Sequence, residues 1–129
     1  MTGLAGRFFA SALIYAVLGM SLGLLMGITK DHTQMPTHAH LLLIGWVSFT
    51  LIGFFYYLFP ERASSRWANV HFWLAQASIL VLIAGLAQIF AGYESGEPFA
   101  AVGSIGLLIS TVLFAIIAWP AFGRGHAPL

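Results

Sequence analysis

The strongest constraint in this sequence comes from four apolar stretches, each long enough to cross a lipid bilayer as a helix. They cover residues 7–29, 37–59, 67–91 and 98–122, with short polar segments between them. A bilayer core needs about 20 apolar residues of α-helix. The stretches also lack the apolar–polar alternation of membrane β-strands. The sequence therefore predicts an all-α membrane protein, with residues 1–129 forming one transmembrane four-helix bundle or arc.

The low content of charged residues supports this prediction. Only 7% of the residues are charged, whereas soluble domains have about 25%, so polar groups cannot cover the surface of this chain. The net charge of +1 gives no indication of nucleic-acid binding. The absence of cysteine excludes disulfides, thiolate metal sites and iron–sulfur clusters. The first apolar stretch exceeds the roughly 7–15 residues of a signal-peptide core, and we expect it to be a retained helix.

The distribution of basic residues predicts the orientation in the membrane. Four arginines fall on the side of the N-terminus, the second connection and the C-terminus: Arg7, Arg62, Arg66 and Arg124. The first connection carries only Lys30, beside Asp31. Because Lys and Arg favour cytoplasmic loops, we expect both termini to be cytoplasmic. In a bacterial inner membrane, the first and third connections would then face the periplasm.

Three glycines in the first apolar stretch predict a close helix–helix contact. Gly19, Gly23 and Gly27 recur at four-residue spacing, and such a stripe of small residues lets another helix approach closely. We favour packing within the chain over a contact between subunits.

Two histidines, His38 and His40, open the second apolar stretch. A helix turns about 100° per residue, so positions i and i+2 point in nearly opposite directions. The pair therefore predicts one ligand for each of two separate sites, unlike the i, i+4 pair of helical zinc sites. His38 shares a face with Gly45 and Phe49, and the glycine notch would leave room for a flat group such as a porphyrin. A wet, interfacial, non-ligating role for both histidines is the alternative.

Other polar side chains are weaker candidates for a binding site. Gln88 is predicted near the depth of His40, where its amide could donate to an imidazole or a haem propionate. His32 and Met35 could join the histidine pair in a copper site, since methionine suits Cu(I). We expect His71 to be an interfacial residue near the cytoplasmic face.

The segment HAHLLLIGWVSFTLIGFFYYLFP, residues 38–60, resembles the tenth helix of subunit I of the haem–copper oxidases. That helix opens with H-x-H, contains a mid-helix glycine, matched here by Gly53, and ends in F-P. In the family, the first histidine binds the high-spin haem, and the second binds the low-spin haem on the opposite side of the helix. The resemblance implies that His38 is the high-spin-type ligand and His40 the low-spin-type ligand. The family's H-P-E-V-Y-type segment, adjacent histidine pair and copper-crosslinked tyrosine have no counterpart, so oxidase catalysis by one chain is not expected.

The resemblance also implies an assembly. The family's twelve-helix subunit consists of three four-helix arcs, and this chain corresponds to one arc. We therefore expect a homotrimer, with a homodimer second, that holds haem b between protomers and transfers electrons near the periplasmic face; its electron donor and acceptor are unidentified. The alternatives are a five-coordinate haem that binds gases, a copper-binding membrane protein, and a non-catalytic accessory or assembly subunit of a respiratory oxidase.

Overall fold

The computed structural model describes residues 1–123. Arg124, used above to predict orientation, lies outside the described residues. The described part contains eight helical elements and no strand. The elements are α1 (Gly3–Thr29), α2 (Met35–His40), the π-helix η1 (Leu41–Ser48), α3 (Phe49–Leu58), α4 (Pro60–Ala63), α5 (Arg66–Phe90), the 3₁₀-helix η2 (Glu94–Gly96) and α6 (Glu97–Phe122).

Within residues 1–123, four continuous helical rods are long and apolar enough to span a membrane. Their bounds are Gly3–Thr29, Met35–Leu58, Arg66–Phe90 and Glu94–Phe122. The second rod joins α2, η1 and α3, and the fourth joins η2 and α6. The predicted fold class, an all-α membrane protein with four spans, is confirmed.

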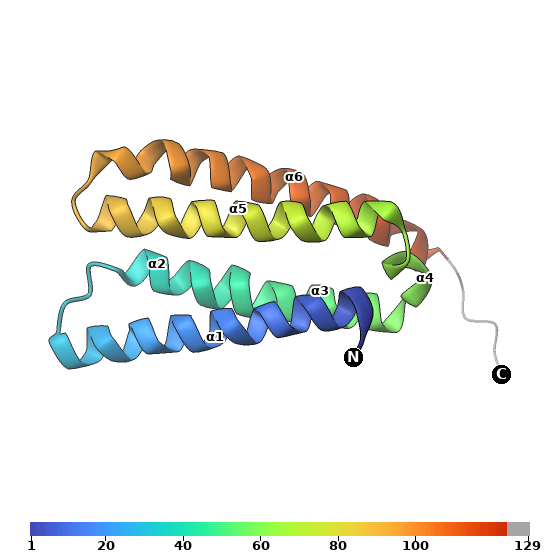
Figure 1. Cartoon of the computed structure of the whole chain (residues 1–129), viewed down its shortest axis with the longest axis horizontal. Coiled ribbons are helices and arrows are strands. Elements are labelled where there is room, and N and C mark those ends of the chain that lie inside the picture. Colours follow the sequence, from blue (N-terminus) through green and yellow to red (C-terminus); the bar gives the residue numbers. More distant parts are fainter. Residues whose placement is uncertain (124–129) are drawn as a thin grey trace.

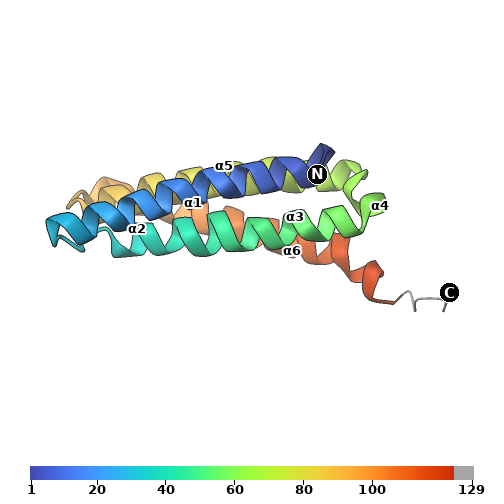
Figure 2. The ribbon, with the colours of Figure 1, turned by 90° about the horizontal axis from the view of Figure 1, so that it is seen from below.

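The rods run side by side along the long axis of the molecule, and consecutive rods are antiparallel (Figure 1). The N-terminus, α4 and the end of α6 lie at one end, which we call the N-terminal end. The α1–α2 and α5–α6 connections lie at the opposite end. In the view from below, α1 lies in front of α5, and α3 lies in front of α6 (Figure 2). Because α2 follows the first connection directly, its histidines lie at the end opposite the N-terminus.

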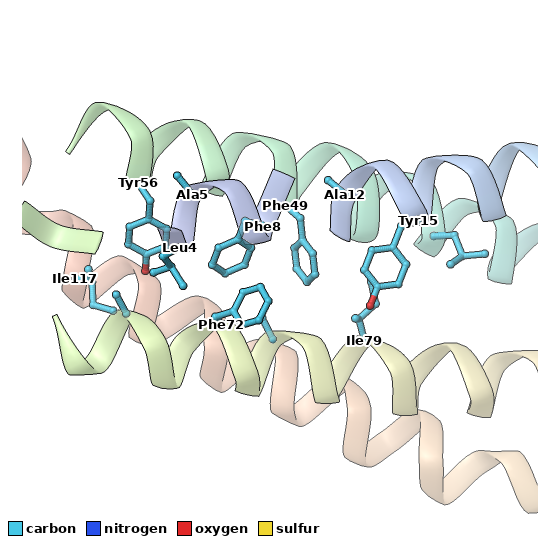
Figure 3. Packing of buried hydrophobic residues seen from close by; sticks show 13 residues of the cluster. Leu4, Ala5, Phe8, Ala12, Tyr15, Phe49, Tyr56, Phe72, Ile79 and Ile117 are labelled. Carbon is cyan, nitrogen blue, oxygen red and sulfur yellow. The ribbon is translucent and has the colours of Figure 1, made fainter. Parts of the chain in front are cut away.

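Aromatic side chains fill the interior between the α1–α3 pair and the α5–α6 pair, close to the N-terminal end (Figure 3). Phe8 of α1 is fully buried and meets Phe49 and Phe72 edge to face, with ring centroids 5.5 and 4.9 Å apart. Such pairs contribute about 0.5–1.5 kcal/mol each beyond their buried area. In a membrane, where lipid is as apolar as the side chains, this packing is a main source of helix association.

Polar side chains also connect α1 with α5. The Tyr15 hydroxyl donates to Gln76 Oε1 at 2.9 Å, and Gln76 Nε2 donates to Ser11 Oγ at 2.7 Å. At the N-terminal end, Arg7 donates to the Asn69 side chain at 3.1 Å. Hydrogen bonds between membrane helices contribute only about 0.6 kcal/mol on average. Their main effect here is to fix how α1 is aligned along α5.

Helices α5 and α6 approach each other through glycines. A Cβ added at Gly103 would collide with the backbone nitrogen of Leu82, and one added at Gly85 would collide with that of Ala100. Since backbone atoms cannot move aside as a side chain can, the α5–α6 contact requires glycine at both positions.

Candidate functional site

His38 and His40 lie on α2, just before the chain enters the π-helix η1. Pro36 occupies the first turn of α2, where the missing proline N–H leaves no helix hydrogen bond unmade. Two side-chain contacts hold this turn: Gln34 donates to the Ala87 carbonyl on α5 at 3.1 Å, and Thr37 donates to Gln34 at 2.7 Å. The start of the histidine-bearing helix is therefore fixed against the end of α5.

His38 faces α1 of its own chain. Its Nδ1 lies 2.7 Å from the Gly19 carbonyl oxygen, and its ring packs over Gly23. A Cβ added at Gly23 would lie only 2.6 Å from His38 Cε1, whereas one added at Gly27 would meet nothing within 4 Å. Packing of the glycine stripe within the chain is thus confirmed for Gly19 and Gly23, and Gly27 takes no part in it.

His40 faces away from α1. Its Nδ1 lies 2.7 Å from the carbonyl oxygen of Pro36, one turn back on the same helix. Val47, Leu51 and Phe54, farther along the second rod, are all exposed. The two histidines therefore have different surroundings, as their spacing predicts.

The hydrogen bonds of the two rings decide which nitrogen of each can bind a metal. A carbonyl oxygen only accepts hydrogen bonds, so Nδ1 of both His38 and His40 must carry the ring proton. Each Nε2 then keeps its lone pair, and within residues 1–123 neither Nε2 has a hydrogen-bond partner. An imidazole that donates Nδ1–H to a backbone carbonyl and presents Nε2 is the usual arrangement of a metal-ligating histidine.

Gly45 and Phe49 lie on the same side of the second rod as His38, and both contact α1. Phe49 is 2% exposed and packs edge to face against Tyr15, with ring centroids 5.8 Å apart. A Cβ added at Gly45 would lie 2.6 Å from Tyr15 Cγ. Tyr15 of the same chain therefore fills the glycine notch, and the expectation that the notch leaves room for a porphyrin is wrong. Direct cofactor contact by Gly45 and Phe49 stays a prediction.

The second rod is not a regular α-helix throughout, although its sequence predicts one. Residues Leu41–Ser48 form a π-helix, and Ser48 Oγ donates to the Leu43 carbonyl five residues back at 2.8 Å. π-Helical turns are rare and are often found at functional sites. This one directly follows the two histidines.

Gln88 lies near the end of α5 that contacts the start of α2, so it is at the same end of the bundle as the histidine pair. Its Oε1 accepts from Ser95 Oγ at 3.2 Å, and its carbonyl accepts from the backbone N–H of Tyr93. No contact joins Gln88 to either imidazole in the described residues. Its predicted role as a donor to an imidazole or a haem propionate stays a prediction.

The ligands considered for a copper site do not form a cluster. His32 is exposed in the first connection, where its Nδ1 lies 3.2 Å from the Lys30 carbonyl, and Met35 is 46% exposed. In the part of the chain that the structure describes, no three histidine, aspartate or glutamate side chains gather as a metal site would require.

His71 is not the interfacial residue that we expected; that prediction is wrong. Its side chain is 1% exposed, and its Nδ1 lies 2.9 Å from the Tyr56 hydroxyl. Its ring lies between Phe8 and Phe114, each with a centroid 5.2 Å away. The position of His71 near one end of α5 suggested the membrane interface, but the side of the helix on which it lies determines its burial. The buried positions Ala68, His71, Phe72 and Ala75 recur at helical spacing, so they form one side of α5 that faces the interior. That periodicity is the sequence signal that was missed.

One known protein family matches most of the chain. Residues 28–122, which include both histidines and η1, match the family described as Cytochrome C and Quinol oxidase polypeptide I. The chain belongs to this family. No curated protein and no solved structure matches it. Members of the Cytochrome C and Quinol oxidase polypeptide I family bind haem, and the Nε2 lone pairs of His38 and His40 are donors that suit haem iron.

Proposed function

We propose that this protein is a membrane b-type haem protein whose axial ligands are Nε2 of His38 and Nε2 of His40. One observation carries the proposal: both Nδ1 atoms donate to backbone carbonyls, which leaves both Nε2 lone pairs available to iron. Membership of a haem-binding family supports it. When bound, haem would supply reversible one-electron oxidation and reduction of iron.

The opposite surroundings of the two histidines support a haem shared between copies of the chain. One chain offers one imidazole on each side of α2, and bis-histidine ligation needs two imidazoles on one iron. The missing imidazole would come from an identical chain, so that His40 of one protomer and His38 of its neighbour hold the same haem. The exposed apolar side chains of Val47 and Leu51, on the same rod as His40, suit such a contact.

A homotrimer is the assembly we favour, because three four-helix chains would provide the twelve helices of the oxidase subunit that the sequence resembles. A homodimer with a shared haem is the second choice. We place the histidine end of the bundle at the periplasmic face of a bacterial inner membrane and both termini in the cytoplasm. Electron transfer between as yet unidentified partners would occur at that face.

The contacts of the His38 ring with Gly19 and Gly23 of α1, which we call the His38 seat, orient this ligand in the proposal. Nδ1–H of His38 is held by the Gly19 carbonyl, and the ring rests on the bare backbone at Gly23. Both contacts restrict rotation of the imidazole, so the direction of Nε2 is set before any iron binds. His40 is held in the same way by the Pro36 carbonyl.

The absorption spectrum of the purified protein separates the proposed function from its alternatives. Sharp α and β bands after reduction are expected for low-spin bis-histidine haem b. A broad high-spin spectrum that shifts with CO would indicate a five-coordinate, gas-binding haem. A colourless protein that contains copper would indicate a copper site, and a colourless metal-free protein would indicate an accessory subunit.

Native mass spectrometry in detergent tests the assembly. Since each protomer provides two imidazoles and each haem uses two, the expected species is a trimer with three haems. A dimer that retains haem would replace the trimer with the second assembly. A stable monomer without haem would contradict shared ligation altogether.

A further inference from the structure

A small, partly open cavity lies between the second rod and the α5–α6 pair. Its volume is about 130 Å³, and residues of η1, α3, α5 and α6 line it. Among the mostly apolar lining residues are four polar ones: Ser48, His71, Ser110 and Thr111. Polar groups inside a membrane protein are costly unless they have a partner, and an ionisable one there indicates a functional site.

The contacts of His71 determine which hydrogen-bonding group it has left over. Tyr56 is 1% exposed, and its hydroxyl has no partner in the described residues other than His71 Nδ1. If Nδ1 carried the ring proton, the hydroxyl proton of Tyr56 would have no acceptor. The tyrosine therefore donates to Nδ1, and Nε2 of His71 carries the ring proton. This Nε2–H has no acceptor within residues 1–123.

A second residue of the cavity wall, Ser110, also has a polar group without a hydrogen-bond partner in the described part of the chain. Ser110 is 2% exposed, and its hydroxyl makes no hydrogen bond to any other described residue. Thr111 donates to the Leu107 carbonyl and Ser48 donates to the Leu43 carbonyl, both at 2.8 Å. Both of these hydroxyl oxygens keep lone pairs that can accept. The cavity wall thus offers one ring donor, one unpartnered hydroxyl and two further acceptors.

We propose that this cavity is a hydration site, in which water accepts from His71 Nε2–H and bonds to the Ser110 hydroxyl. A water molecule occupies about 30 Å³ of liquid and makes two to four hydrogen bonds when buried. The cavity is large enough for water, and it is far too small for a porphyrin. Ser48 and Ile44 of the wall belong to η1, so the π-helix forms one side of the site. The water brings exchangeable protons to a histidine that is otherwise enclosed by aromatic rings.

Magic-angle-spinning NMR of the full chain in lipid bilayers, with ¹⁵N-labelled histidine, tests this proposal. The His71 signal is assigned by its loss in His71→Gln. Its nitrogen shifts are expected to show the Nε2–H tautomer, and magnetisation is expected to transfer from water to that proton. Ser110→Ala should reduce the transfer at least two-fold. Ser104→Ala, on the exposed side of the same helix, should leave it unchanged.

An Nδ1–H tautomer, or no transfer from water in the unmodified protein, would overturn the proposal. Thermal unfolding gives an independent readout. Ser110→Val fills part of the cavity, so it should raise the melting temperature if the cavity is dry. We expect it to lower the melting temperature, because it displaces water from the His71 donor. Neither measurement depends on haem. The hydration proposal can therefore fail while the haem assignment holds, and the haem assignment can fail while the hydration proposal holds.

Discussion

Replacement of Gly23 by alanine is the most direct perturbation of the His38 seat. The added Cβ would lie 2.6 Å from His38 Cε1, whereas ordinary contact begins at 3.4 Å, so the ring must move by about 0.8 Å. That movement disturbs the 2.7 Å hydrogen bond to the Gly19 carbonyl. Overpacking of this kind typically costs about 1–3 kcal/mol in total, and we expect Gly23→Ala to lose that much stability. The disturbed hydrogen bond accounts for about 0.5–1.5 kcal/mol of this loss.

Gly27→Ala provides the matched control, since Gly27 lies on the same helix and a Cβ there meets nothing within 4 Å. Alanine is the better helix former, so this variant should be neutral or more stable by up to about 1 kcal/mol. The assay is the free energy of unfolding in detergent, measured for both variants together with haem bound per protomer. Gly23→Ala should lose stability and haem, and Gly27→Ala should lose neither. Equal effects of the two variants would refute the geometry of the His38 seat.

Two further predictions concern the His71–Tyr56 pair and the proposed orientation. Tyr56→Phe removes the one hydrogen-bond partner that buried His71 has among residues 1–123, and it should destabilise the protein by about 1–3 kcal/mol in thermal or chemical unfolding. Tyr57→Phe, at a residue 57% exposed, should have little effect, and equal effects would contradict the pairing. Because the chain has no cysteine, a single introduced cysteine reports the membrane topology without background labelling. Ser95→Cys should react with an impermeant maleimide in intact cells, whereas Ser64→Cys should react only after permeabilisation. The reverse result would show that the proposed orientation is inverted.

The four spans could be predicted because they depend on a property summed over about 20 residues. A chain with such continuous apolar stretches has few alternatives to membrane helices, since every backbone polar group must be satisfied within the membrane. The short connections then dictate antiparallel neighbours. Helix bounds beyond the apolar stretches were not predictable in the same way: α1 begins at Gly3, four residues before the apolar stretch, because helix and membrane segment need not coincide.

The opposite directions of His38 and His40 were also predictable, because they follow from two residues of helical rotation. What each histidine faces was not, because it depends on residues distant in sequence. Gly19 lies 19 positions before His38, and its carbonyl holds that ring. The same limit explains Gly45: the sequence shows an absent side chain, but only the fold shows that Tyr15 takes its place.

The π-helix and the buried His71–Tyr56 pair were missed for related reasons. The sequence of residues 41–48 gives no indication of a π-helix, because apolar residues continue through this segment without a break. For His71, depth along α5 was considered before the face of the helix. Reading the face from Ala68, Phe72 and Ala75 would have placed the imidazole inside the bundle.

The central claim is that His38 and His40 bind haem iron, and the reduced absorption spectrum of His40→Ala beside that of the unmodified protein tests it most directly. We predict sharp low-spin α and β bands for the unmodified protein. We predict that His40→Ala either loses haem or changes to a high-spin spectrum. A colourless unmodified protein, or low-spin bands that persist in both His40→Ala and His38→Ala, would contradict the claim.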